Sequence, residues 1–331
     1  LKRLFFERTY MDILYIIWFD VLPILVFLGG GWFLAGKFKI KVKTYEIVIT
    51  RVVLPCFVFF NLYQVPPAAS DLLLLPAALL LTAILFVLSA LLAKGLSQEP
   101  SLRQAICGMA SCPNVCYLGG VLTYLTFSHL PFASAGEAAE LPKALALLSL
   151  LMTLSHLLLR TVGHAIVSKE SSSLSSLLLR ALTTPVLYGA LLAFAAAHFD
   201  IPLKGTFLYP VLHHFTGAFI VLTAVTTGVM IRRSHCFTVS KDILLPALVK
   251  LLVSPLLALG LLAIFPSMDD LAKEILLLFA AIPCAMDFSM VGTTSAQKSI
   301  FQRSLMTQMS LSILTLPLVI FLCRLFFPAS M

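Results

Sequence analysis

Two stretches of the chain combine proline with polar or acidic residues inside otherwise apolar sequence. SCPNVCYLGG, at 111–120, contains Pro113 followed by Asn114, and AIPCAMDFSMVG, at 281–292, contains Pro283 and Asp287. Proline within a helix removes a backbone hydrogen bond and leaves carbonyl and amide groups unpaired. Such backbone groups, together with the donors and acceptor of an amide side chain, can bind a small anion. The expected substrate site comprises Pro113, Asn114, Val115, Pro283, Cys284, Ala285 and Met286.

Two titratable residues could couple ion movement to such a site. An ionised carboxylate within a membrane span is costly unless it is paired, hydrated or protonated, so Asp287 is a candidate proton carrier or cation ligand. The alternative is that Asp287 is a structural partner for a basic residue such as Arg51, Arg160 or Lys250. His156 lies one helical turn before Arg160 and is a candidate proton relay, with a packed, hydrogen-bonded histidine as the alternative.

Other polar or small residues in the apolar runs have structural interpretations. Asp20 is expected at a hydrated membrane interface, and Arg51, Arg180 and Lys250 are expected to extend their charges to nearby cytoplasmic ends. Arg51 is the deepest of these and could also meet a substrate carboxylate. The glycines at 29–31 lack the lysine of a phosphate loop and are expected to allow close helix packing. Seven cysteines without a CxxC pair are expected to be packing residues, so we predict no metal and no cofactor.

The composition places these residues in a membrane protein. The chain has 331 residues, of which 60% are hydrophobic and 11% charged. A helix of about 20 apolar residues crosses a bilayer core, and runs of that length recur along the whole chain. We therefore predict an all-α polytopic membrane protein. Its ten spans are expected at 12–36, 44–63, 71–93, 103–126, 143–167, 177–198, 207–231, 243–265, 274–297 and 304–327, with short polar connections such as AQKSIFQR between them.

The distribution of charge orients these spans. Most Lys and Arg residues fall in one set of alternate connections, whereas Lys143, Lys204 and Lys273 share the other set with most of the loop carboxylates. Because short cytoplasmic loops are rich in Lys and Arg, both termini are predicted on the non-cytoplasmic side of the cell (inner) membrane. The net charge of +8 reflects this bias, and we expect no nucleic-acid partner. Residues 1–10 contradict the rule, so they are expected to be an extension or an incorrectly assigned start before Met11.

A repeat is visible when the two halves are read in opposite orientations. DLLLLPAALLLT at 71–82 resembles DILLPALVKLL at 242–252, and the two enter the membrane from opposite sides. Pro113 follows Pro76 by the same interval as Pro283 follows Pro246. This pattern predicts inverted repeats of five spans, 11–167 and 168–331, in which the broken fourth and ninth helices cross at the midplane.

Several motifs resemble the auxin efflux carrier family, which includes plant PIN auxin carriers and bacterial malate and organic-acid permeases. They are PNVCYLG at 113–119, RVVLPCFVFFNL at 51–62, RALTTPVLYGALLAF at 180–194, DVLPILVFLGGGWFLAGK at 20–37 and the stretch from 280 through the last span. The resemblance implies a fold shared with bile acid and sodium/proton carriers. Spans 1, 2, 6 and 7 would form a scaffold, spans 3–5 and 8–10 a transport bundle, and related carriers dimerise through the scaffold.

The expected function is secondary active transport of a small organic anion, most simply a carboxylate, by alternating access. The coupling ion is left open between a proton and sodium. One alternative is a sodium-coupled symporter of the bile acid type. Another, of a different class, is a membrane scaffold or receptor that transports nothing. An enzyme is not expected, because neither HExxH nor a pair of aspartates in facing motifs occurs.

Overall fold

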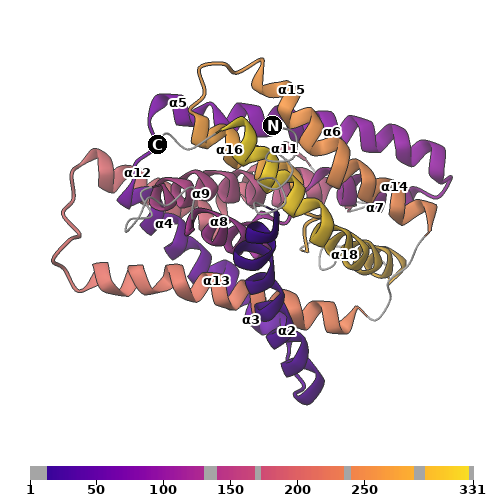
Figure 1. Ribbon diagram of the computed structural model, residues 1–331, viewed down its shortest axis with the longest axis horizontal. Coiled ribbons are helices and arrows are strands. Elements are labelled where there is room, and N and C mark those ends of the chain that lie inside the picture. Colours follow the sequence, from indigo (N-terminus) through magenta and orange to yellow (C-terminus); the bar gives the residue numbers. More distant parts are fainter. Residues whose placement is uncertain (1–12, 130–139, 168–172, 235–239, 287–294, 328–331) are drawn as a thin grey trace, which may run out of the picture.

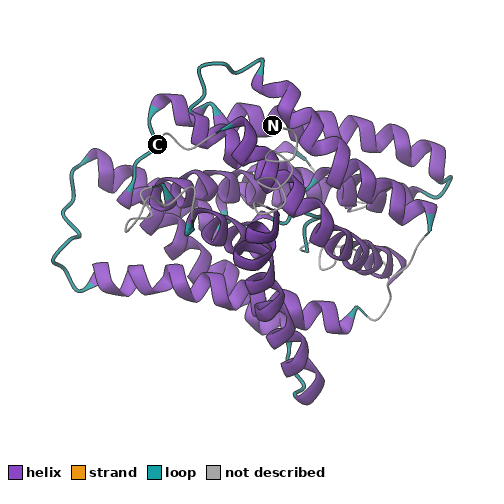
Figure 2. Ribbon diagram, in the orientation of Figure 1, coloured by secondary structure: helices purple, strands orange, loops and turns teal. Residues whose placement is uncertain are grey.

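The computed structural model describes residues 13–129, 140–167, 173–234, 240–286 and 295–327. These residues are almost entirely helical, as Figure 2 shows. Seven helices within them are long and apolar enough to cross a membrane, and the count rises to eight if one bent pair is a single span. The protein is therefore built as a multi-pass integral membrane protein. The prediction for residues 1–10 lies outside the described residues.

The helices follow one another in chain order with short connections. The first half contains η1 (Ile17–Val21), α2 (Leu22–Lys37), α3 (Val42–Val48), η2 (Ile49–Val53), α4 (Leu54–Gln64), α5 (Ala69–Leu72), α6 (Leu74–Leu96), α7 (Pro100–Ser111), η3 (Val115–Gly119), α8 (Gly120–Phe127), α9 (Leu141–Leu158), η4 (Leu159–Gly163) and α10 (His164–Val167). The second half contains α11 (Leu174–Leu182), α12 (Pro185–His198), α13 (Leu208–Arg233), α14 (Lys241–Leu248), η5 (Val249–Val253), α15 (Ser254–Leu262), α16 (Asp270–Ala281) and α18 (Ser295–Phe326).

Predicted spans 1, 2, 3, 5, 7 and 8 agree with long apolar helices within a few residues, and the others differ. The predicted fourth span is divided between α7 and α8, and α16 of the predicted ninth span ends at Ala281, with 287–294 outside the described residues. The connection AQKSIFQR is part of α18, which begins at Ser295, so the prediction of a loop there was wrong. Its polar and apolar residues can lie on different faces of one helix, with Phe301 buried and Gln302 exposed. The predicted sixth span is also interrupted, because α11 and α12 meet at an angle of 61° immediately before Pro185. Proline disfavours helical backbone in the residue before it, which explains the bend.

Three of the long spans contain a π-helical turn shortly before a proline. Pro23, Pro55 and Pro255 each follow such a turn: η1, η2 and η5, respectively. Proline lacks the N–H that would bond four residues back, and its ring crowds that carbonyl, so a widened turn relieves the clash. Asp20, Arg51 and Lys250 all lie within these turns.

The helices pack in two groups. In the first, α2 packs along α13 and α4 packs along α12; Figure 1 shows α13 along one edge of the molecule with α2 crossing it. In the second, α7 contacts α6, α14 and α18, while α16 contacts α15 and α18. Helix α9 lies between the groups, because it contacts α4 and α12 as well as α8 and α16.

Two glycines determine how closely α2 and α13 approach. A Cβ atom on Gly31 would lie 2.0 Å from the carbonyl oxygen of Val225, and one on Gly228 would lie 2.0 Å from that of Leu28. The two backbones are therefore in direct contact, as small residues permit in membrane helices. The prediction of close packing is confirmed for Gly31 and is wrong for the glycines at 29 and 30, whose added Cβ atoms would meet nothing within 4 Å.

Candidate functional site

The two helix breaks predicted from Pro113 and Pro283 lie against each other. Helix α7 ends at Ser111 and α16 ends at Ala281, and the extended residues that follow them form an antiparallel bridge between Pro113 and Cys284. The N–H of Asn114 donates to the carbonyl of Pro283 at 2.8 Å, and the N–H of Ala285 donates to that of Cys112 at 2.9 Å. Each break therefore satisfies backbone groups of the other, as backbone without water requires.

The contact between residues 112–114 and 283–285 is called the crossing below. Gln308 of α18 completes its hydrogen bonding. The N–H of Cys284 donates to Gln308 Oε1 at 2.8 Å, and Gln308 Nε2 donates to the carbonyl of Met109 at 3.1 Å. The same nitrogen also lies 3.1 Å from the hydroxyl of Ser304. Gln308 is fully buried. One side chain thus binds the backbone of both broken segments and holds them together.

Lys250 and Ser254 bind the C-terminal end of α16. In a continuous helix the carbonyl of Ala280 would accept from the N–H of residue 284, but Cys284 donates to Gln308 instead. Ala280 therefore accepts from Ser254 Oγ at 2.9 Å and Lys250 Nζ at 3.2 Å. Lys250 has an exposed fraction of 0%, so the prediction that its charge extends to a cytoplasmic end was wrong. The carbonyl of Ala280 at the break gives the amine a polar partner inside the protein.

A small cavity lies beside the crossing, with a volume of about 20 Å³. Asn114, Val115, Ala285 and His156 are among its lining residues. Among the described residues, Asn114 Nδ2 and His156 Nε2 have no hydrogen-bond partner, although both side chains are buried. A cavity of this size has room for one water-sized group. The residues that carry these two polar atoms therefore border a space large enough for one hydrogen-bonding group of the size of a water molecule.

A larger vestibule of about 580 Å³ adjoins this cavity, and the two share His156 and Leu159 as lining residues. Its walls come from the start of the second span, the end of the fifth, the junction of α11 and α12, and the start of α18. The charged lining residues are Lys43, Arg51, Arg160, Arg180 and Lys298, with Glu46 as the acid among them. Cations that are far apart in sequence therefore surround one opening, where their fields add and attract anions.

The predicted site residues have different positions in this arrangement. Pro113, Asn114, Val115 and Ala285 line the small cavity, and their role in substrate binding stays a prediction. The backbone groups of Pro283 and Cys284 are used in the crossing itself. Met286 is turned toward α13, where Thr227 Oγ1 donates to its sulfur at 3.5 Å. His156 and Arg160 face the same vestibule. Asp287 lies outside the described residues.

The prediction that Asp20 lies at a hydrated membrane interface was wrong. Its carboxylate has an exposed fraction of 0% and lies 3.0 Å from Nη2 of Arg324, near the end of α18. The side chain is thus buried in an ion pair rather than hydrated at an interface. A carboxylate in the first span and a guanidinium in the last have no relation that local sequence could reveal.

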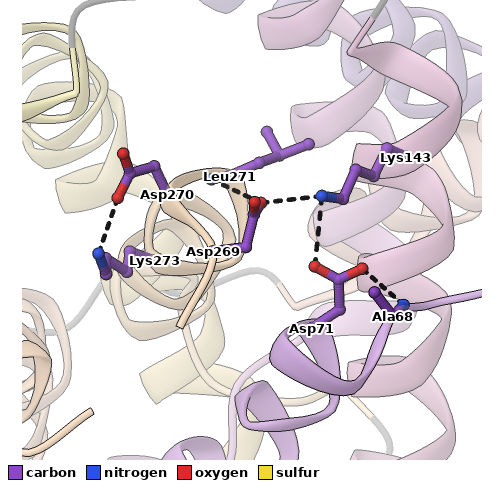
Figure 3. A network of polar contacts seen from close by, with 7 residues as sticks. All are labelled: Ala68, Asp71, Lys143, Asp269, Asp270, Leu271 and Lys273. Atoms are coloured by element: carbon purple, nitrogen blue, oxygen red, sulfur yellow. Dashed lines mark hydrogen bonds and ion pairs between the residues drawn. The ribbon is translucent and has the colours of Figure 1, made fainter. Parts of the chain in front are cut away.

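A network of ion pairs around Lys143 connects residues near the N-termini of three helices (Figure 3). Lys143 Nζ lies 3.3 Å from Asp71 Oδ1 and 3.0 Å from Asp269 Oδ2. Asp71 also accepts from the N–H of Ala68, and Asp269 accepts from that of Leu271. The network ties α5, α9 and α16 together. The nearby Glu140 has a raised pKa because of burial and the negative charge of Asp269, while Lys143 acts in the opposite direction.

Sequence reasoning missed the roles of three residues. Gln308 cannot be distinguished in the sequence from Gln297, another polar residue of the last helix, which pairs with Gln104 at 3.0 Å. Lys250 was assigned to a membrane surface. Glu274 is the first residue of the predicted span 274–297, yet it is 4% exposed within α16. The available signal for Lys250 and Glu274 was a charged residue inside or beside an apolar run.

A comparison with protein-family models found no family that matches this chain, and a comparison with curated proteins found no match. The resemblance to auxin efflux carriers therefore depends on the short motifs quoted above.

Proposed function

We propose that this protein is a secondary carrier for a small organic anion. The observation that carries the proposal is the basic vestibule, which adjoins the cavity at the two helix breaks through His156 and Leu159. Five Lys and Arg residues against one Glu favour entry of a negatively charged solute. Broken helices beside a polar cavity are the arrangement that membrane carriers use for substrate sites.

Within this proposal, Arg51 and Arg160 attract the anion, and Asn114 binds it. The Asn114 amide has a donor nitrogen without a partner in the described part of the chain. A carboxylate oxygen would accept from it, and His156 would donate a second hydrogen bond in a suitable tautomer or when protonated. His156 is accordingly the proposed coupling residue among those that the structure describes, together with Asp287 from the sequence.

The proposed architecture has ten crossings in two inverted repeats, with broken spans four and nine. The pairing of α2 with α13 and α4 with α12 supports a scaffold of spans 1, 2, 6 and 7. The contacts of α7 and α16 with α18 support a second, movable group. In the structure the vestibule adjoins the crossing from the end that carries Lys43 and Lys298. This corresponds to one of the two states of an alternating-access cycle, and dimerisation through the scaffold remains part of the proposal.

Transport by the full chain in proteoliposomes tests the proposal. Radiolabelled mono- and dicarboxylates should exchange across the membrane, while a cation of similar size should not. Arg51→Gln should raise KM about tenfold, because it removes one of the charges that attract the anion, and a loss of about 1.4 kcal/mol in binding is about tenfold. Lys94→Gln is the matched control, since Lys94 is exposed and outside the vestibule.

Two outcomes would contradict the proposal. One is a panel in which no anion exchanges although the reconstituted protein keeps its helical circular dichroism. The other is exchange that is equally fast in wild type, Arg51→Gln and Asn114→Ala. Exchange that needs sodium would support the bile-acid type of carrier. Ligand binding without exchange would support a receptor.

A further inference from the structure

An apolar groove of about 250 Å³ runs between α2 and α18, on a different part of the molecule from the vestibule. Its walls include Leu25, Gly29 and Trp32 from α2 and Met309 and Ile313 from α18, and Leu118 and Ile231 form its floor. Both wall helices belong to spans that are apolar enough to cross a membrane. The groove is therefore bounded by residues at bilayer depth.

The groove is open beside Gly29 of α2. A Cβ atom at that position would meet nothing within 4 Å, so α2 and α18 do not close on each other there. Leu25, Trp32 and Ile313 have exposed fractions of 39%, 45% and 42%. Apolar side chains exposed at this depth are in contact with lipid, and an acyl chain is the apolar molecule present there in excess.

Cations lie at one end of this groove. The guanidinium carbon of Arg232 is 3.9 Å from the centroid of the Trp32 ring, and Trp32 lines the groove. Arg232 directly follows Ile231 of the groove floor, at the end of α13. Lys37, at the end of α2, has its amine 4.7 Å from the Phe33 ring. Two positive charges are thus held on aromatic rings where the apolar helices end, which is where phospholipid headgroups lie.

We propose that the groove binds an anionic phospholipid from the bilayer. One acyl chain would lie between α2 and α18, and the phosphate would accept hydrogen bonds from Arg232 and Lys37. Charge complementarity selects an anionic headgroup over a zwitterionic one, because basic residues at the membrane surface attract negatively charged lipid. This inference does not depend on the transport function.

The site has a structural consequence. Helix α2 belongs to the group that packs on α13, whereas α18 belongs to the group that contains α7 and α16. A lipid in the groove would contact both groups at once. Its affinity would therefore change whenever the two groups move relative to each other.

Native mass spectrometry of the purified full chain tests the proposal, with phosphatidylglycerol and phosphatidylcholine of identical acyl chains as probes. Phosphatidylglycerol should bind about fivefold more tightly for each cation that contacts it, from roughly 1 kcal/mol per basic residue. Arg232→Gln should remove about that factor, whereas Lys94→Gln, at an exposed site away from the groove, should leave binding unchanged. Soluble glycerol phosphate should not compete, because it lacks the acyl chain.

A steric variant tests the acyl position separately. Gly29→Phe should fill the groove and reduce binding of both lipids, while Gly30→Phe, on the neighbouring residue outside the groove, should not. Lys37→Gln provides a second charge variant should Arg232→Gln fail to fold, as judged by circular dichroism. The proposal is overturned if phosphatidylglycerol has no preference over phosphatidylcholine. It is also overturned if Gly29→Phe and Gly30→Phe bind equally well.

Discussion

The backbone N–H of Asn114 donates to the carbonyl of Pro283, and this hydrogen bond joins breaks that lie in opposite halves of the chain. Together with the bond from Ala285 to Cys112, it supplies partners that a broken helix would otherwise lack in a medium without water. The pairing uses backbone atoms on both sides and therefore leaves the side chains of the break available. Asn114 Nδ2 is available in this sense among the described residues.

Gln308→Ala should destabilise the protein by about 1–3 kcal/mol, because the N–H of Cys284 and the carbonyl of Met109 would be buried without partners. Thermal unfolding in detergent measures the effect. Gln302→Ala is the matched control, since Gln302 is exposed on the same helix. Equal melting temperatures for the two variants would show that Gln308 does not hold the crossing together.

Asp20→Asn should cost about 3–5 kcal/mol, because it removes the buried carboxylate that pairs with the Arg324 guanidinium. Asp270→Asn should cost less than about 1 kcal/mol, since Asp270 pairs with Lys273 at the surface and its side chain is 76% exposed. Denaturation of both variants, with Asp20→Leu/Arg324→Leu as a third, measures the difference. The double variant should recover much of the loss; a double variant as unstable as Asp20→Asn would argue against the ion pair as the cause.

Gly31→Ala and Gly228→Ala should each lower stability by about 1–3 kcal/mol, because the added methyl group would overlap a carbonyl of the facing helix. Gly30→Ala should be neutral or slightly stabilising, since its Cβ would enter open space and alanine favours the helix. Melting temperatures of the three variants are sufficient for this comparison. A drop as large for Gly30→Ala as for Gly31→Ala would contradict the contact between α2 and α13.

Lys250→Met should keep or raise the melting temperature, because it removes a buried charge while Ser254 still donates to the Ala280 carbonyl. Adding Ser254→Ala should then lower stability by about 1–3 kcal/mol, since that carbonyl loses both donors. Ser254→Ala alone is the control and should cost less, because Lys250 remains. A large loss in Lys250→Met by itself would mean that the lysine stabilises the break.

The class of the protein, several of its apolar spans and the positions of the helix breaks could be predicted from the sequence. These depend on local properties: long apolar runs require helices in a bilayer, and proline interrupts the helix in which it lies. Pro113 and Pro283 could therefore be recognised without knowledge of the fold. Asn114, Val115 and Ala285, which are expected to bind substrate, line the small cavity, and their binding role stays a prediction.

Which polar residues meet could not be predicted, because it depends on how distant helices pack. Asp20 pairs with Arg324, and Gln308 bonds to Met109 and Cys284, although nothing near these residues in sequence indicates the partner. In a membrane helix both the lipid-facing and the protein-facing sides are apolar, so periodicity does not reveal which face is buried. A charge in an apolar run has the same local pattern whether it reaches the surface or, like Lys250, binds the carbonyl of a broken helix. The packing of neighbouring helices makes that choice.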